Sequence, residues 1–363
     1  MAVSIDIGTR AVQILSGQVR KSGHIALKEN KLIMVPADIL TESKNERQNS
    51  IFSLIKPVLS AMNVRHADCS FTLSDDRFLI RELKLPKAPD KELRNIAKQE
   101  MINLYSAAED DIVEIDNIVR LPDNSISVRA AAFGKVQTDG YWNFAIDASM
   151  NPRSLGFHSS SISKLAATKP DVNGSPIGSV NVILADMGMF ACIVHAISSG
   201  KSVFSRYLPV GFGELSHALM LMAYPEMMAH PEMMMHPDDQ GGAGVLQSAI
   251  LQGNILRDAS FDYESSVHRS YPQHIAQQIE LFFSKLADEL TKTLRFLISS
   301  KIINHIDAIY LFGGGSQIHG LAQRLGRAVN IRTEDVETIS TISAPDGIHR
   351  DLPYLLNCVG SLL

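Results

Sequence analysis

Two Asp-x-Gly turns and one run of three glycines are the parts of this chain whose residue types and spacing could do chemistry. The Asp-x-Gly motifs occupy residues 6–8 and 186–188, and the glycine run occupies residues 313–315. Glycine in a tight turn lets the backbone approach an anion closely and direct N–H groups at it. Carboxylate oxygens are ligands that hydrated Mg²⁺ prefers. The set therefore predicts an anionic ligand, with Asp6 and Asp186 holding Mg²⁺ through water molecules.

The elements that must position these turns are short apolar strands. Residues 3–17 predict a hairpin with Gly8 and Thr9 at its tip, and the pattern strand, Asp-x-Gly, strand returns over 180–197. The glycine run follows a predicted strand at 306–311 and precedes a predicted helix, whose N-terminus suits a phosphate or sugar contact. A single Asp-x-Gly is a weak signal, and ordinary tight turns are the alternative interpretation. The ordered set of three is more specific.

The remaining elements follow from hydrophobic spacing and from Pro, Gly and Asn positions. Pro57 is expected to kink or split a helix over 48–62, and Asp90 is expected to cap the next helix. The Pro- and Gly-rich stretch 169–179 predicts a linker. The other expected elements are strands at 69–73, 78–85, 112–119, 125–133 and 203–208, and helices at 137–149, 160–167, 273–304 and 320–329.

Composition favours a large globular protein. The chain has 363 residues, of which 45% are hydrophobic and 20% are charged. This length predicts two lobes rather than one, and the hydrophobic content supplies a large core. The formal net charge of −5 and the absence of a polybasic stretch argue against nucleic acid as a partner.

Cysteine usage and hydropathy predict a cytoplasmic protein. The three cysteines, Cys69, Cys192 and Cys358, are far apart and sit among apolar neighbours, which indicates buried thiols in a reducing compartment. The N-terminus lacks the basic and apolar regions of a signal peptide. No apolar stretch is long enough to predict a membrane-spanning helix.

Several other functional classes find no support. The chain contains no Walker A motif, no GxGxxG after the first strand and no GxSxG elbow. A Met-rich segment, 224–237, contains His230 and His236, and Met with His suits copper. Its prolines break any helical face, so we favour a segment that packs opportunistically over a metal site.

The ordered set of turns resembles the actin/Hsp70-like ATPase superfamily and, within it, the PilM family of type IV pilus assembly. The second of four matching stretches corresponds in that family to a subdomain called 1C, which the division protein FtsA shares and actin lacks. The resemblance covers nearly the whole chain except the Met-rich insertion and residues 238–272. The matching stretches are SIDIGTRAVQIL, RELKLPKAPDKELRNIAKQEM, ADMGMFACIVHAISSGKSVFSRYLPVGFGEL and IDAIYLFGGGSQIHGLAQRLG.

This resemblance implies an α/β protein with the two-lobed actin-like ATPase fold, made of duplicated ribonuclease-H-like domains with a 1C-type insertion. The implied subdomains are 1A at 1–35 plus 134–179, 1C at 36–133, 2A at 180–215 plus 305–363, and 2B at 216–304 with a Met-rich insertion at 224–240.

The resemblance also implies a site for ATP and Mg²⁺. The sequence departs from the family pattern in three places. Residues 189–191 are Met-Phe-Ala where Ser or Thr is usual, and residues 155–158 lack the usual carboxylates. Gln13 stands where Lys is common. Phosphoryl transfer depends on positioning and charge. We therefore expect a nucleotide-binding pseudo-ATPase, with an active ATPase or a sugar kinase as the alternative. The implied nucleotide-binding residues are Asp6, Gly8, Thr9, Arg10, Asp186, Gly188, Gly211, Gly213, Gly313, Gly314, Gly315 and Ser316.

The implied partners are proteins. Similar proteins hold the cytoplasmic N-terminal peptide of a bitopic membrane protein, PilN, between subdomains 1A and 1C, here residues 1–35 and 36–133, and relay this contact to the pilus motor ATPases. The expected location is cytoplasmic, at the inner membrane only through partners, and self-association is left open. The alternatives are an FtsA-like cytoskeletal protein and a type II secretion L-type protein. The latter is disfavoured because no transmembrane helix follows.

Overall fold

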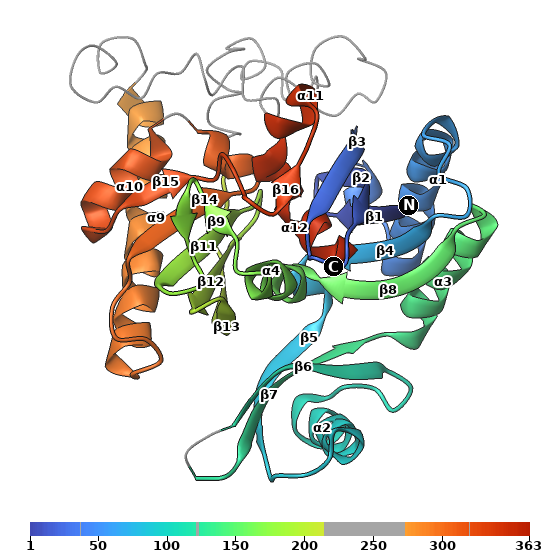
Figure 1. The fold of residues 1–363 in the computed structure, drawn as a ribbon, viewed down its shortest axis with the longest axis horizontal. Helices are drawn as coiled ribbons and strands as arrows, with labels where there is room; N and C mark the ends of the chain where they lie inside the picture. Colours follow the sequence, from blue (N-terminus) through green and yellow to red (C-terminus); the bar gives the residue numbers. More distant parts are fainter. Residues whose placement is uncertain (37, 121–122, 214–272, 319) are drawn as a thin grey trace. The chain divides into compact units, whose positions relative to one another are not determined.

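The chain divides into two compact units. A computed structural model describes all residues of 1–363 except 37, 121–122, 214–272 and 319. The boundary at Pro170 and Asp171 lies within the predicted linker 169–179. Unit 1 comprises Met1–Pro170, Ser340–His349 and Leu355–Leu363, and unit 2 comprises Asp171–Ile339 and Arg350–Tyr354 (Figure 1).

A six-stranded sheet forms the centre of unit 1, in the order β16-β3-β2-β1-β4-β8. β1 pairs antiparallel with β2, as the predicted hairpin requires, and parallel with β4 on its other side. This arrangement makes β1 a central strand. The strand bounds are β1 Ala2–Ile7, β2 Ala11–Val19, β3 Ile25–Met34, β4 Asp68–Leu73, β8 Asn151–Phe157 and β16 Ile342–Ser343.

Alternate residues of β1 point to opposite faces of the sheet. Val3, Ile5 and Ile7 belong to a hydrophobic cluster with residues of α1 (Lys44–Ala61) and α3 (Lys135–Asp147). Ser4 points to the opposite face, where its hydroxyl contacts that of Ser361 in α12 (Leu352–Leu362). α4 (His158–Ala167) packs on this second face too, because Thr72 of β4 and Ser161 of α4 are hydrogen-bonded at 3.0 Å. Asp6, two residues after Ser4, therefore faces the α4 side of the sheet.

Helix α1 differs from the sequence expectation, since it runs through Pro57 as one helix. It begins with a capping box in which Ser43 and Glu46 exchange hydrogen bonds. Ile51, Ile55 and Leu59, on both sides of the proline, are all buried. Burial of this continuous apolar face compensates for the single backbone hydrogen bond that proline removes.

A second, three-stranded sheet in unit 1 has the order β5-β7-β6 and is covered by α2. Its separate core includes Leu83, Val128, Leu93 and Met101. Pro89, rather than the expected Asp90, occupies the N-cap position of α2, and it makes no side-chain capping hydrogen bond. The element bounds are β5 Leu79–Leu85, α2 Asp90–Tyr105, β6 Ile112–Arg120 and β7 Ile126–Phe133, with short 3₁₀ turns at Asp38–Thr41 and Asp75–Arg77.

The boundary of this small-sheet region differs from the expected 36–133. Helix α1 and strand β4, which lie within that range, pack in and pair with the six-stranded sheet. The small sheet with α2 therefore covers only residues 79–133. The bounds of the 1C-type subdomain stay a prediction.

Unit 2 repeats the strand arrangement of unit 1 around β11. Its five-stranded sheet has the order β13-β12-β11-β14-β15, with β11 antiparallel to β12 and parallel to β14. A two-stranded ribbon of β9 and β10 precedes it. The bounds are β9 Asp171–Val172, β10 Ser175–Pro176, β11 Asn181–Met187, β12 Cys192–Ser198, β13 Lys201–Leu208, β14 Ala308–Phe312 and β15 Thr333–Asp335.

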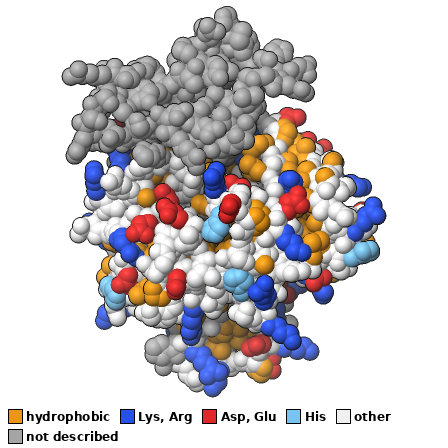
Figure 2. All heavy atoms as spheres, turned by 45° about the horizontal axis from the view of Figure 1, so that its top comes forward, with side chains coloured by type: hydrophobic (Ala, Val, Ile, Leu, Met, Phe, Trp, Pro, Cys, Tyr) orange, Lys and Arg blue, Asp and Glu red, His pale blue; other side chains and the backbone are white. Residues whose placement is uncertain are grey.

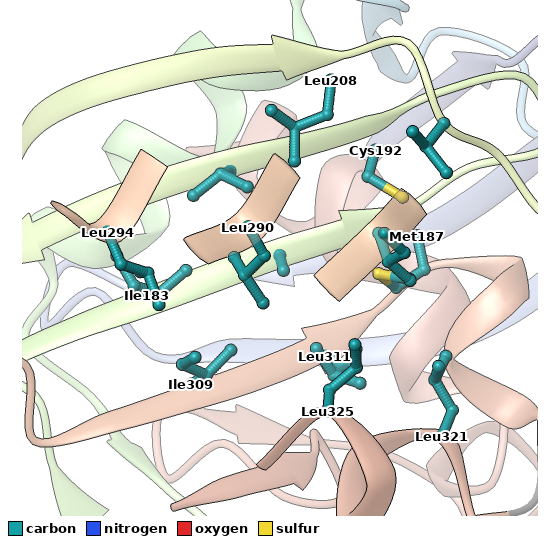
Figure 3. Packing of buried hydrophobic residues seen from close by; sticks show 14 of the residues in the cluster. Ile183, Met187, Cys192, Leu208, Leu290, Leu294, Ile309, Leu311, Leu321 and Leu325 are labelled. Carbon is teal, nitrogen blue, oxygen red and sulfur yellow. The ribbon is translucent and has the colours of Figure 1, made fainter. Parts of the chain in front are cut away.

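Helices α9 (Gln273–Ser299) and α10 (Leu321–Val329) cover one face of this sheet. Figure 3 shows Leu290 and Leu294 of α9 and Leu325 of α10 packed over Ile183 and Leu311 of the strands. The helix predicted at 273–304 thus supplies apolar side chains to this core. The expected Met-rich insertion, with His230 and His236, lies outside the described residues.

The C-terminal segment corrects a second expected boundary. Residues 305–363 were assigned together to the second lobe, but residues 340–349 and 355–363 belong to unit 1. Strand β16 pairs with β3 through Ile342 and Ile25, and Leu355 and Cys358 are buried. A strand of two residues has no hydrophobic periodicity, so the sequence could not predict that β16 pairs with β3. The short helix α11 (Asp346–His349) follows β16.

All three cysteines are free and buried, which confirms the predicted thiols. Burial raises the pKa of Cys69 to about 12 and also raises the pKa values of Cys192 and Cys358. Among the described residues, no helix has the length and apolar character needed to cross a membrane.

Gly360 is expected to be indispensable to the packing of α12. A Cβ at this position would lie 2.1 Å from the carbonyl oxygen of Ser161, whereas a Cβ at Gly347 would meet nothing within 4 Å. We expect Gly360→Ala to lower the free energy of unfolding by about 1–3 kcal/mol or more through overpacking. Gly347→Ala should raise it by about 0.4–1 kcal/mol, because it only restricts the unfolded chain.

Urea denaturation of the two variants and the parent measures both effects. Equal stability of the Gly360→Ala variant and the parent would contradict the described packing of α12 on α4.

Candidate functional site

The two Asp-x-Gly hairpins have the same turn. In each, the glycine N–H donates to the carbonyl of the alanine three residues later: Gly8 to Ala11 and Gly188 to Ala191, both at 3.0 Å. A Cβ would lie 3.1 Å from that carbonyl oxygen at Gly8 and 2.6 Å at Gly188. The second turn therefore excludes any side chain at its glycine, and the first accommodates one poorly. The weak internal duplication in the sequence corresponds to a duplicated geometry.

Both aspartates occupy the carboxyl end of a central strand. Asp6 is paired with Thr72 on the parallel neighbour β4, and Asp186 is paired with Phe312 on the parallel neighbour β14. Both side chains are largely buried, at 6% and 7% residue exposure. In α/β sheets, ligands bind beyond the carboxyl ends of parallel strands. Each unit thus carries one buried carboxylate at such an end.

In unit 2 the glycine run lies directly against the second hairpin. Gly313 has a φ of +84° and a ψ of 175°, a conformation essentially restricted to glycine. A Cβ on Gly313 would lie 2.3 Å from Oδ1 of Asp186. Ser316 closes the turn, because its hydroxyl donates to the Gly313 carbonyl at 2.8 Å. The carboxylate of Asp186 and the backbone of the glycine run are therefore neighbours.

The loop after β13 completes the same site. The Gly213 N–H donates to the Met189 carbonyl at 2.7 Å, and a Cβ on Gly211 would lie 2.3 Å from that oxygen. A Cβ on Gly315 would lie 2.7 Å from the ring of Phe212. We call this set the turn cluster; it consists of Asp186, Gly188, Gly211, Gly213, Gly313, Gly314, Gly315 and Ser316. The structure brings together every site residue that the sequence predicted within unit 2.

In unit 1, Asp6 has a partner that the sequence analysis did not identify. Nε2 of His158 lies 2.7 Å from Oδ1 of Asp6, and both side chains are 8% exposed. An ionised carboxylate only accepts hydrogen bonds, so Nε2 carries the proton and donates it. His158 is the first residue of α4, directly after β8. The position of His158 directly after a strand that is parallel to β4 is the feature that could have indicated this contact.

Arginines surround the tip of the first hairpin, which holds the predicted residues Thr9 and Arg10. Nη2 of Arg77 donates to the Gly8 carbonyl at 3.3 Å. Nε and Nη1 of Arg10 are buried and have no hydrogen-bond partner in the described structure, and burial lowers the pKa of Arg10. Arg47 is also partly buried, and desolvation and the charge of Arg77 lower its pKa. Arg10 and Arg77 therefore bring two guanidinium groups to this hairpin tip, and the charges of Asp76 and Glu42 act on Arg47 in the opposite sense to that of Arg77.

The two predicted magnesium ligands lie in different units. Asp6 belongs to unit 1 and Asp186 to unit 2. Among the described residues, no group of three His, Cys, Asp or Glu side chains is arranged to hold a metal ion. Residues 189–191, at the tip of the second hairpin, supply no side-chain oxygen. Magnesium held through water by Asp6 and Asp186 stays a prediction.

A buried arginine connects the small sheet to α4. Arg129 of β7, 2% exposed, donates from Nε and Nη2 to the two carboxylate oxygens of Asp116 at 2.7 and 2.9 Å. Nη2 also donates to Ser163 of α4 at 3.0 Å, and the guanidinium lies 5.4 Å from the ring centre of Phe157. These contacts fix the position of the small sheet beside α4 and β8.

Charged side chains of both signs are mixed on the face drawn in Figure 2. Acidic and basic side chains of the described residues are interspersed there with hydrophobic ones, without a continuous basic stripe. This distribution agrees with the formal net charge of −5.

Comparison with known proteins identifies the fold. Residues 247–354 match the family model described as Type IV pilus assembly protein PilM. The protein of the structure titled "PilM-PilN type IV pilus biogenesis complex" superposes with a TM-score of 0.72 at 17% identity, covering 99% of this chain and 97% of that one. Ethanolamine utilization protein EutJ from Carboxydothermus hydrogenoformans gives a TM-score of 0.50 at 12% identity, covering 100% and 89%. No curated protein matches by sequence. The chain shares its fold with the PilM protein of that complex, and the predicted actin-like ATPase fold is confirmed.

The contact of Gly313 with Asp186 can be tested against a matched glycine. Gly174 also has a positive φ, +76°, but a Cβ there would meet nothing within 4 Å. Both alanine substitutions impose backbone strain, whereas only Gly313→Ala also forces a methyl group against the carboxylate. We expect Gly313→Ala to cost about 1–3 kcal/mol more than Gly174→Ala in the free energy of unfolding.

Thermal and urea denaturation of the two variants in parallel measure this difference. Equal losses in the two variants would show that Asp186 does not lie against the glycine run.

Proposed function

We propose that this PilM-like protein is a nucleotide-binding scaffold of type IV pilus assembly that also binds the cytoplasmic N-terminal peptide of a PilN-like membrane protein. The observation that carries the proposal is the duplicated Asp-x-Gly hairpin, combined with a glycine run lying against the second aspartate. The likeness to a PilM protein over nearly the full length of both chains supports the same assignment.

The nucleotide part of the proposal follows from backbone geometry. The N–H groups of Gly8 and Gly188 are used within their own turns, so in this proposal the next main-chain N–H groups of each turn contact phosphate oxygens. Gly313 and Gly314 are partly exposed and have no side chains, which suits contact with a nucleoside. The proposed ligand class is ATP or ADP, and the candidate contacts are Gly8, Thr9 and Arg10 in unit 1 and the turn cluster in unit 2.

Slow hydrolysis follows from the side chains at the turns. Attack by water on a phosphate requires a group that orients the water and groups that stabilise the developing charge. Met189, Phe190 and Ala191 supply neither at the second hairpin, and residues 155–158 contain no carboxylate. His158, the polar side chain of that stretch, donates its Nε2 proton to Asp6. The arrangement favours binding over turnover.

The peptide part of the proposal concerns the small sheet. The partner peptide binds between the small sheet with α2, residues 79–133, and the six-stranded sheet of unit 1. The buried Arg129 network sets the spacing between these two layers and so sets the shape available to a peptide. Through this partner the protein would be cytoplasmic, would lie at the inner membrane and would contact the pilus motor ATPases.

A binding measurement with a conservative substitution tests the peptide site. Arg129→Lys keeps a positive charge opposite Asp116 but loses the two-pronged hydrogen bonding that also reaches Ser163. We expect it to weaken binding of a fluorescent PilN-like N-terminal peptide by about tenfold or more, because a shift of the small sheet removes interactions worth at least about 1.4 kcal/mol. The measurement is fluorescence polarisation, with and without Mg-ATP.

Arg94→Lys is the control, because Arg94 of α2 and Glu114 of β6 form an ion pair of exposed side chains. It should change the affinity by less than about twofold, since exposed ion pairs contribute little. Failure of the parent protein to bind any PilN-like peptide, in either condition, would rule out the peptide part of the proposal.

A further inference from the structure

We propose that the nucleotide site of this chain works without a magnesium ion: Nε2–H of His158 satisfies Asp6, and Arg10 supplies the positive charge that the phosphates require. This inference rests on the proposed nucleotide-binding function and concerns the same site. It is carried by three features of unit 1.

The first feature is the engaged carboxylate of Asp6. A carboxylate holds hydrated Mg²⁺ by accepting hydrogen bonds from the metal-bound waters. Oδ1 of Asp6 already accepts from Nε2 of His158 at 2.7 Å, in a position where both side chains are 8% exposed. The interaction that a metal-bound water would make is therefore made by a ring N–H of the protein.

The second feature is that His158 is held in place by its surroundings. The adjacent Ser159 donates its backbone N–H to Oδ1 of Asp75 at 3.0 Å, and its hydroxyl donates to Oδ2 of the same carboxylate. Ser161 in the next part of α4 is hydrogen-bonded to Thr72. These hydrogen bonds hold the first turn of α4 against β4 and the turn that follows it. The backbone position of His158 beside Asp6 is therefore restrained.

The third feature is the guanidinium of Arg10, at the hairpin tip. Its Nε and Nη1 are buried and have no hydrogen-bond acceptor within the described chain. Buried donors without acceptors are unfavourable, and a planar guanidinium matches two phosphate oxygens at once. Arg77 steadies the same tip by donating to the Gly8 carbonyl. Gln13, where related proteins commonly have Lys, lies opposite Asp6 across the hairpin and adds no charge.

The neighbouring stretch of unit 1 adds no further metal ligand to Asp6. Residues 155–158 offer no carboxylate beside Asp6, and the described residues contain no cluster of metal ligands. The donors around Asp6 in unit 1 therefore do not fit a magnesium site. They fit an anion whose charge is balanced by protein donors.

Calorimetric titration of the full-length protein with ATP, in excess EDTA and separately in excess MgCl₂, tests the inference. We expect the two dissociation constants of the parent to agree within about twofold. Arg10→Gln should weaken binding about tenfold or more in both conditions, because a charge-assisted phosphate contact is lost. Arg20→Gln, which removes an exposed arginine of the β2–β3 turn, should change neither constant by more than about twofold.

His158 variants test the role of the imidazole directly. His158→Ala leaves Asp6 without its donor, so we expect ATP affinity in EDTA to fall about tenfold and MgCl₂ to restore it, since the free carboxylate then repels phosphate unless a metal lies between them. His158→Gln keeps an N–H donor and should bind ATP equally in both conditions. Near-UV circular dichroism confirms that each variant is folded, and if His158→Ala is not, the parent and the Arg10 variant decide.

The outcomes separate the two levels of the proposal. Loss of parent affinity in EDTA by about tenfold or more overturns the metal-free inference and leaves nucleotide binding intact. Unchanged affinity in Arg10→Gln also overturns it. Absence of ATP binding by the parent in both conditions overturns the nucleotide-binding function together with the inference.

Discussion

The closed turn at the carboxyl end of a central strand is the constraint on which the rest of this structure depends. In each unit, a glycine N–H donates to the carbonyl of an alanine three residues later. That hydrogen bond leaves no room for a side chain at Gly188 and little at Gly8. It fixes the hairpin register, which in turn sets the face of the sheet to which Asp6 and Asp186 point. The parallel strand beside each hairpin then brings a second chain segment to the same edge.

The two units satisfy their buried aspartates differently, and this difference bears on function. Asp186 lies against the backbone of Gly313, and its carboxylate occupies the space that a Cβ on Gly313 would need. Asp6 accepts a hydrogen bond from His158, and Arg77 donates to the carbonyl of the adjacent Gly8. The two units thus share the turn geometry and differ in the side chains around it. In the proposed function, this difference favours binding of an anion over hydrolysis.

Much of this arrangement could be predicted from the sequence, because it follows from local signals. Apolar stretches that end in Asp-x-Gly or Gly-Gly-Gly predicted the hairpins and the glycine turn, and hydrophobic spacing predicted helix α9. The resemblance supplied the order of the elements. Gly211 and Gly213 came from that resemblance alone, and the structure explains them by close backbone approach to Met189.

The features that were missed depend on contacts between distant residues. The partnership of His158 with Asp6 joins positions 152 residues apart, and neither residue marks the other in the sequence. The pairing of the two-residue strand β16 with β3 and the return of residues 355–363 to unit 1 are likewise tertiary. For Pro57 the local signal was wrong. Proline predicted a kink or a break in the helix, but α1 continues through it because apolar residues on both sides of the proline are buried.

Hydrogen–deuterium exchange of the protein with and without saturating ATP tests the central claim most directly, because it reports on the backbone amides of all three turns at once. The account predicts slower exchange at residues 7–11, 187–191 and 313–317, with the small sheet at 112–133 unchanged. Protection by ATP that is absent from these turns, or confined to other segments, would contradict it.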